Sequence, residues 1–188
     1  MHRKRLLDKL RAHQPYDAHE AAMLRATREF VEANAACFDR SLRAGHITGS
    51  AWVLDLARTH VLLTHHQKLE RWLQLGGHAD GNHDVLQVAL CEAKEESGLP
   101  EVSPISEAIF DVDVHLIPAR GDQPGHLHYD VRFLLQADRQ HPLTVTHESK
   151  ALAWVELSQV AALNAEASLL RMVAKTIAST ANIRRPYD

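Results

Sequence analysis

The chain has 188 residues, of which 45% are hydrophobic, and its formal net charge is -3 at pH 7. This length suits one domain with an extension and can bury a sizeable core, and the small net charge gives no indication of a nucleic-acid or lipid surface. No apolar run approaches the ~18 residues of a membrane span, so no membrane partner is expected. Cys37 and Cys91 are too widely spaced for a disulfide framework or a zinc pattern, which favours a reducing, cytoplasmic setting.

The first 44 residues predict two helices. Residues 3–13 carry a leucine pattern typical of a short helix, which Pro15 interrupts. Asp17 and Glu20 then have the spacing of a capping box at the start of a second helix, which we expect to run to about residue 37. We therefore expect residues 1–44 to form a helical extension packed on the domain. A homodimer contact and a lid over a binding site are the alternatives for these helices.

Residues 45–188 predict one domain in which strands surround a central helix. Apolar runs and alternating patterns predict the strands, and capping residues predict the helices. The expected strands span residues 47–55, 61–64, 72–75, 110–116, 127–135 and 151–155, and the expected helices span residues 85–97, a short segment after Ser158 and a final segment after Asn164. This succession supports an α/β or α+β domain.

The central helix directly follows a glycine-containing loop. Asp84 can cap the start of this helix, and Gly98, followed by Pro100, suits its end. Within one turn the helix carries three carboxylates, Glu92, Glu95 and Glu96. Each like-charge pair at this spacing costs roughly 0.2–0.5 kcal/mol. The cluster is either a solvated acidic face or a set of oxygen ligands for a hard divalent cation such as Mg²⁺.

The same stretch resembles the Nudix box, the pattern G-x5-E-x7-R-E-U-x-E-E-x-G-U in which U is aliphatic. The residues at the required spacings are Gly77, Glu92, Glu95, Glu96, Gly98 and Leu99. Two positions depart from the pattern, since His83 stands where the first Glu is expected and Cys91 where the Arg is expected. The resemblance implies the family's fold, a Nudix-like α/β/α sandwich with a mixed β-sheet, here preceded by the N-terminal helical extension.

The resemblance also implies a metal-dependent hydrolase that cleaves the pyrophosphate linkage of a nucleoside diphosphate derivative. The cofactor is then Mg²⁺, with Mn²⁺ as the alternative, and the partner is a small-molecule nucleotide substrate. By the same resemblance Glu92 and Glu96 are metal ligands, Glu95 is a further ligand or the catalytic base, and the Gly77 carbonyl is a further metal contact. Glu148 lies where some relatives carry the base on a distal loop, and a solvated loop carboxylate is the alternative reading.

The two departures affect how the glutamates are oriented. In the family the Arg orients the catalytic glutamates by ion pairing, and Cys91 cannot hold a carboxylate in that way. One consequence is lower activity. The other is that a different cation takes this place, for which the candidates are Arg132, Arg120 and Lys94. His83 is either a metal ligand or a solvated loop histidine.

Histidines recur beside carboxylates on the polar faces of the later strands. If these strands pair, imidazoles and carboxylates share one polar surface. A neutral imidazole can bind zinc-like metals or donate to phosphate or ribose. We therefore expect a substrate-binding surface formed by His78, His115, His126, His128 and Arg132. Cross-strand hydrogen bonding on a polar sheet face is the alternative.

Two other functions stay open at this stage. Gly76-Gly77-His78 is similar to a glycine–histidine pair of the isopentenyl diphosphate isomerases, which share this fold, although their catalytic cysteine is missing here. The second alternative is a nucleotide-binding Nudix domain without catalysis. The three retained glutamates favour chemistry, because a binding module has no need of three repelling carboxylates, whereas the missing Arg weakly favours the non-catalytic reading.

Overall fold

The computed structural model describes residues 2–119, 121, 124–147 and 149–183, which form a mixed sheet flanked by helices. Two helices, α1 (Lys4–Ala12) and α2 (Ala18–Ala33), come first in the chain. The strands are β1 (Gly45–Asp55), β2 (His60–His66), β3 (Arg71–Leu73), β4 (Leu75–His78), β5 (Ser103–Ile117), β6 (His126–Ala137) and β7 (Ser149–Glu156). The later helices are α3 (Val85–Ser97), η1 (Leu157–Gln159), α4 (Val160–Leu163) and α5 (Ala167–Ile183).

The sheet is built around β1, which pairs with three other strands. Its order is β3-β2-β1-β6-β5, with β4 paired to β1 and β7 paired to β2. The pair of β1 and β6 is parallel from Gly45 opposite Leu127 to Asp55 opposite Ala137, whereas β1 pairs antiparallel with β2 and β4. The sheet is therefore mixed, as the sequence predicted.

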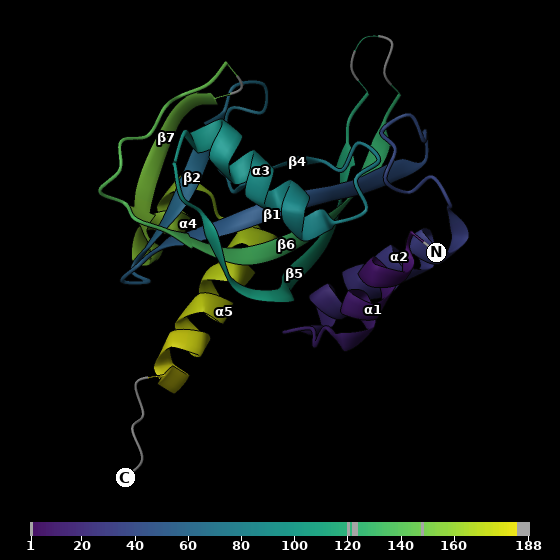
Figure 1. The fold of residues 1–188 in the computed structure, drawn as a ribbon, viewed down its shortest axis with the longest axis horizontal. Coiled ribbons are helices and arrows are strands. Elements are labelled where there is room, and N and C mark those ends of the chain that lie inside the picture. Colours follow the sequence, from purple (N-terminus) through teal and green to yellow (C-terminus); the bar gives the residue numbers. More distant parts are fainter. Residues whose placement is uncertain (1, 120, 122–123, 148, 184–188) are drawn as a thin grey trace.

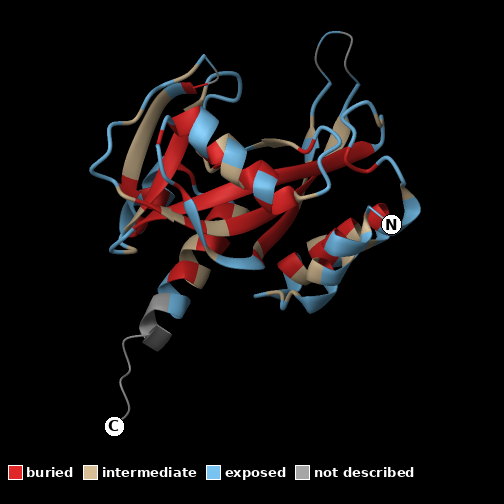
Figure 2. Ribbon diagram, in the orientation of Figure 1, coloured by how far each residue is buried: buried red, intermediate tan, exposed pale blue. Residues whose placement is uncertain are grey.

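Each face of the sheet has its own apolar core. On one face, Ala51 and Val53 of β1 lie in a core with Ala89 of α3, and on the other face Trp52 of β1 lies in a core with Met172 of α5. Figure 1 shows α3 and α5 on different sides of the strands, and Figure 2 shows β1 buried along its length. A strand covered on both faces is expected to be apolar without alternation, as residues 51–54 of β1 are. The α/β/α sandwich predicted from the sequence is thereby confirmed.

The N-terminal helices contribute to the core on the α3 side. Leu6 and Leu10 of α1 are buried there together with Val31 of α2, and the Phe30 ring stacks on Tyr129 of β6 at 3.8 Å between centroids. Because these apolar side chains are covered by the chain's own sheet, the extension packs on the domain in this structure. None of the helices in the described residues is long and apolar enough to cross a membrane.

Glu20 ties α2 to α5 from a fully buried position. Its Oε1 accepts from Lys175 Nζ at 2.7 Å and lies 2.7 Å from His13 Nε2, and its Oε2 accepts from the Tyr16 backbone N–H at 2.6 Å. Burial alone would raise the pKa of Glu20, but the hydrogen bonds from His13, Lys175 and Tyr16 lower it to about 2. The carboxylate is therefore held ionised inside the protein.

Three details differ from the sequence expectations. Helix α2 ends at Ala33 rather than near residue 37, and both the backbone N–H and the side-chain amide of Asn34 donate to the Phe30 carbonyl at its end. Strand β5 begins at Ser103 rather than at residue 110, because register shifts between residues 104 and 111 hide its alternation. Asn164, expected to cap the final helix, accepts from the Glu166 backbone N–H, but α5 begins three residues later, at Ala167.

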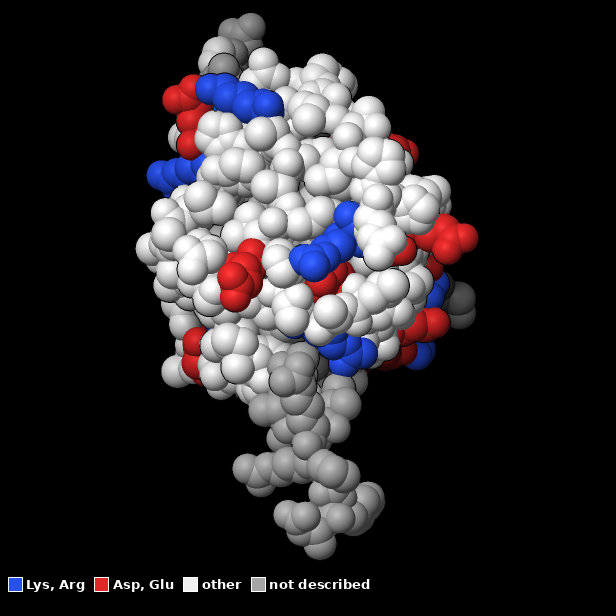
Figure 3. Space-filling model, turned by 90° about the vertical axis from the view of Figure 1, so that its left-hand side faces the viewer, with Lys and Arg blue, Asp and Glu red and all other residues white. Residues whose placement is uncertain are grey.

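Charged side chains on the surface are balanced in sign. On the face drawn in Figure 3, Lys and Arg side chains lie beside Asp and Glu side chains, and the described residues there form no extended patch of one sign. Much of this face carries neither charge. The picture agrees with the net charge of -3 for the whole chain.

Candidate functional site

The short strand β4 brings two glycines against the glutamates of α3. Gly76 has a φ of +154°, a conformation that favours glycine, and its backbone N–H donates to Glu96 Oε1 at 2.8 Å. A Cβ on Gly77 would lie 2.3 Å from Glu92 Oε1, so the Glu92 carboxylate occupies the space that any side chain at residue 77 would need. Both carboxylates therefore lie directly against the backbone of β4.

Helix α3 begins and ends where local chemistry predicts. Asp84 is its N-cap and accepts from the Gln87 backbone N–H, and Gly98 ends it in the left-handed region with φ of 71° while donating to the Lys94 carbonyl at 2.8 Å. These two signals fix where the helix begins and ends, and they therefore fix which of its residues lie beside β4.

The three glutamates of α3 differ in exposure. Glu95 is exposed, Glu92 is half-buried and Glu96 is buried, with a relative exposure of 8%. Glu96 is thus not on a solvated acidic face, because its carboxylate faces the Gly76 backbone. The carboxylates of Glu92 and Glu96, held beside a backbone that leaves room for them, offer the oxygen donors that Mg²⁺ prefers. The residues present therefore fit a hard divalent cation.

Of the residues that bear on the missing Arg of the Nudix box, Cys91 and Lys94 are exposed, unlike the buried Glu96. Cys91 is exposed on α3, and its Sγ accepts from Gln87 Nε2 at 3.2 Å. Lys94 is exposed as well. Two further residues named from the sequence, Arg120 and Glu148, lie outside the described residues.

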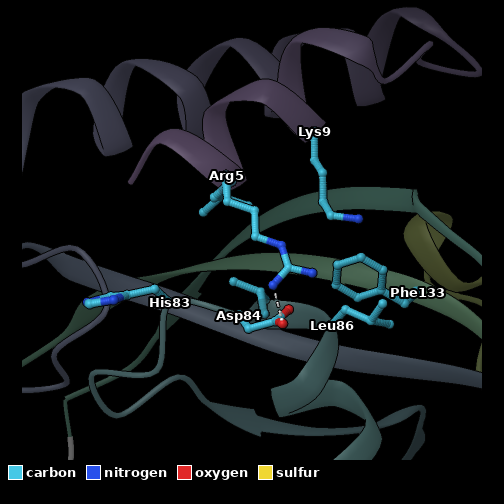
Figure 4. Close-up of a pocket in the computed structure, with 8 residues that line it drawn as sticks. Arg5, Lys9, His83, Asp84, Leu86 and Phe133 are labelled. Carbon is cyan, nitrogen blue, oxygen red and sulfur yellow. Dashed lines mark hydrogen bonds and ion pairs between the residues drawn. The ribbon is translucent and has the colours of Figure 1, made fainter. Parts of the chain in front are cut away.

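His83 lies beside the N-terminal helices. Its exposed ring is 4.8 Å from the His2 ring and 5.1 Å from the Phe38 ring, measured between centroids. Figure 4 shows His83 at a shallow pocket under α1, where Arg5 forms an ion pair with Asp84. His83 therefore lies beside the N-terminal segment, before the first turn of α3, whereas the glutamates lie in the second half of that helix.

Arg132 corrects one expectation from the sequence. Its side chain is only 3% exposed, and its guanidinium donates to Asp130 at 2.7 Å, Asp111 at 3.1 Å and Asp113 at 3.3 Å. Burial opposes the charge of Arg132, but these three aspartates raise its pKa. Because the guanidinium is already held by three carboxylates, Arg132 is not presented to a substrate.

The residues of β1 alternate between the α3 face and the opposite face, which is apolar around Trp52 and polar around Ser50; this polar part is called the polar face. Gly49 of β1 lies against Val88 of α3, whereas the next residue, Ser50, donates to Asp130 at 2.7 Å. Ser50 is opposite Arg132 in the parallel pair, so the Arg132 network lies on the face away from α3. Arg132 therefore cannot replace the missing box arginine beside Glu92.

The predicted histidines gather on this polar face near the start of β6. His78 Nε2 and His128 Nε2 are 3.3 Å apart, and the His128 ring is 5.2 Å from His126 and 5.5 Å from His115 between centroids. The sequence indicated a shared polar surface for these four residues, and the structure brings them together.

His46 joins this group, and sequence reasoning missed it. It lies opposite His128 in the β1–β6 pair, and its ring centroid is 4.8 Å from His128 and 4.9 Å from His78. Burial, followed by the charge of neighbouring His78, lowers the pKa of His46 to about 4 and that of His128 to about 3. The only sequence signal was its position at the start of a predicted strand, which does not reveal the partner strand.

Comparison with known proteins gave a family match and several structural likenesses. Residues 46–175 match the family model described as NUDIX domain. Among solved structures, a C. elegans Ap4A hydrolase in a binary complex is 19% identical with a TM-score of 0.59, covering 72% of this chain and 98% of that chain. The E. coli dihydroneopterin triphosphate pyrophosphohydrolase is 15% identical with a TM-score of 0.57, covering 71% of this chain and 95% of that chain. A search of curated proteins found no match.

The structural likenesses show the fold, and the family match covers more than half of the chain, including both the glutamates of α3 and the glycines of β4. The chain belongs to the NUDIX domain family.

Proposed function

We propose that this protein is a divalent-metal-dependent hydrolase that cleaves the pyrophosphate linkage of a nucleoside diphosphate derivative. The observation that carries the proposal is the contact between the β4 backbone and the two carboxylates Glu92 and Glu96. A Cβ at residue 77 would collide with Glu92, so the absence of a side chain there lets the carboxylate reach its position. Such a cradle is expected where oxygen ligands must converge on one cation.

The chain's own residues supply the rest of the proposed chemistry. A bound Mg²⁺, or Mn²⁺, would neutralise the diphosphate and lower the pKa of an attacking water. Glu92 and Glu96 would hold that ion, together with the Gly77 backbone. Glu95 is the exposed member and is either a third ligand or the base that takes the proton from water. Glu148, which precedes Ser149 in the sequence, is the alternative base.

We propose that the half-buried histidines of the polar face contact only a part of the substrate remote from the glutamates, because they lie on the face of the sheet away from α3. His115 lies beside Asp113, and its side chain is 42% exposed. Imidazoles of this kind can donate to phosphate or ribose oxygens. His78 and His128 lie deeper in the same group. Arg132 is excluded from this role by its three aspartate partners.

The proposal is tested by phosphate or nucleotide release from a panel that includes Ap4A, dihydroneopterin triphosphate, nucleotide sugars and oxidised deoxynucleoside triphosphates. We expect turnover of at least one class with Mg²⁺ or Mn²⁺ and none in excess EDTA. Glu92→Gln should lose that turnover, whereas Glu101→Gln, which removes an exposed carboxylate just after α3, should keep it. Turnover that survives EDTA would contradict the metal requirement, and tight binding of a nucleotide without turnover would favour the non-catalytic alternative.

A further inference from the structure

Three histidines from three different strands converge on the polar face of the sheet. His46 comes from β1, His78 from β4 and His128 from β6. One ring nitrogen from each lies within 4.8 Å of the others. The pairing of the strands produces this convergence, because His46 is directly opposite His128 and His78 is opposite Thr48, the next β1 residue on the same face.

His46 has a buried imidazole for which the protein provides no hydrogen-bond partner. Its exposure is 2%, and among the described residues neither Nδ1 nor Nε2 has a partner. A buried polar group without a partner is costly, and a bound ion is one way to satisfy it. The ring faces His78 and His128, whose centroids are both within 5 Å, so a ligand between the three would satisfy it.

The distances suit a small tetrahedral ion. Two nitrogens that bind the same zinc ion at ~2.0–2.1 Å in tetrahedral geometry lie about 3.4 Å apart. The measured separation between His78 Nε2 and His128 Nε2 is 3.3 Å. All the ligand nitrogens lie within 4.8 Å of one another. Side-chain rotations that bring the most distant pair about 1.4 Å closer would therefore give the separation that a tetrahedral zinc ion needs.

We propose that His46, His78 and His128 form a binding site for an imidazole-preferring divalent transition metal ion of the zinc class. Three imidazoles without a carboxylate suit Zn²⁺, Co²⁺ or Ni²⁺ and not Mg²⁺, which takes oxygen ligands. Three protein ligands leave the fourth tetrahedral position to water or a ligand. The site holds the start of β6, the start of β1 and the end of β4 together.

This site is separate from the glutamates of α3. Gly77 faces Glu92, and successive residues of a strand face opposite sides, so His78 turns to the other face of the sheet. The proposal consequently does not depend on the proposed hydrolase activity. Loss of the histidine site and failure of the hydrolase assay are distinguishable, because zinc binding is measured without substrate.

The test uses the full chain, freed of metal with a chelator and then titrated with Zn²⁺ in competition with a chromophoric chelator. We expect one tightly bound Zn²⁺ per chain, retained in a Glu92→Gln/Glu96→Gln double variant. His78→Gln and His128→Gln should each weaken zinc binding by at least about 100-fold, because each removes a direct ligand and even outer-shell changes cost about 10- to 100-fold. The matched control His141→Gln removes an exposed histidine and should bind zinc like the parent.

A second measurement covers the event that a histidine variant folds poorly. Co²⁺ added to the metal-free parent should give the intense visible absorption of a tetrahedral nitrogen-ligated ion, and Zn²⁺ should displace it. Weak zinc binding to the parent with no such absorption would overturn the proposal and leave a hydrogen-bonded histidine cluster. Zinc binding that is lost in the glutamate double variant and kept in His78→Gln would also overturn it.

Discussion

Gly77 offers the sharpest test of the cradle for Glu92. In Gly77→Ala the new Cβ would lie 2.3 Å from Glu92 Oε1, 2.4 Å from Cδ and 2.7 Å from Oε2. All three atoms belong to the end of one flexible side chain, and Gly77 is not among the residues with positive φ. The backbone can therefore accept alanine, and the carboxylate must retreat by about 1 Å to reach an ordinary contact distance.

The cost to folding should be small. Forcing a side chain off its preferred rotamer costs about 0.5–1.5 kcal/mol. Replacing glycine by alanine at a compatible position stabilises the folded state by about 0.4–1 kcal/mol, because it lowers the conformational entropy of the unfolded chain. We expect the free energy of unfolding of metal-free Gly77→Ala to be within about 1 kcal/mol of the parent. Catalysis should suffer far more, because a misplacement of about 1 Å in a reacting group can reduce the rate about 100-fold.

Metal-induced stabilisation gives a readout that needs no substrate. With Mg²⁺ at ten times its Kd, binding adds about 1.4 kcal/mol to the parent, which for a chain of this size corresponds to roughly 4 °C in Tm. If Gly77→Ala weakens Mg²⁺ binding 100-fold, the same concentration adds less than about 0.1 kcal/mol. The assay is a pair of thermal melts, with and without Mg²⁺, together with turnover on whichever substrate of the panel is cleaved.

Two glycine variants serve as comparisons. Gly121→Ala places a Cβ where nothing lies within 4 Å, at a φ of +56°, so it should show only backbone strain and the full response to Mg²⁺. Gly76→Ala would place a Cβ 2.7 Å from Ser50 Cα at a φ of +154°, so it should destabilise the fold itself. The reasoning is refuted if Gly77→Ala melts and responds to Mg²⁺ like Gly121→Ala and turns over like the parent.

Three further predictions concern single residues. Cys91→Arg should fold like the parent, because Cys91 is exposed, and should keep or raise turnover at saturating metal; a collapse of folding, seen by circular dichroism, would contradict this. Metal-free Glu96→Gln should equal or exceed the parent's stability by at most about 0.5 kcal/mol, because one like-charge contact, with Glu92 four residues earlier, is relieved, yet Mg²⁺ should raise its Tm less; an unchanged Mg²⁺ response would contradict the assignment of Glu96 as a ligand. The folded pKa of Glu20 is lowered from 4.5 to about 2, so its stabilising contribution is complete above pH 4.5 and is lost as the pH falls toward 2, amounting to ~3 kcal/mol. Urea unfolding of the parent and of Glu20→Gln across that window measures it, and parallel curves would refute it.

The central helix could be predicted from the sequence because its signals are local. Asp84 and Gly98 fix its ends through contacts with residues no more than four positions away, and the glutamate spacing places the carboxylates within one turn. The contact of Glu96 with Gly76 joins residues only twenty apart in the chain. Contacts between residues this close in the chain can be inferred from the sequence. The glycine loop and the carboxylates could therefore be assigned to one site.

The histidine group and the place of Arg132 could not be predicted in the same way. His46 meets His128 only because β1 and β6 pair in parallel over 82 positions of sequence separation, and nothing local specifies that register. Alternation correctly indicated a polar face bearing Arg132, but a polar face is normally read as solvated. Here Arg171 of α5 donates to Asp111 at 2.8 Å, so a buried network covers a face that the pattern alone would leave in water.

Strand β4 links the two proposed metal sites, which differ in chemistry, within four residues. On one side its glycines meet Glu92 and Glu96, a set of oxygen donors suited to a hard ion, and on the other side His78 meets His46 and His128, a set of nitrogen donors suited to a softer ion. Mg²⁺ has little affinity for imidazole, so Mg²⁺ should not displace a zinc-class ion from the histidines. The two sets can therefore hold different metals at the same time. Zinc can bind carboxylates as well, and an excess of it should therefore displace Mg²⁺ from the glutamates and depress the proposed hydrolysis after the histidine site is full.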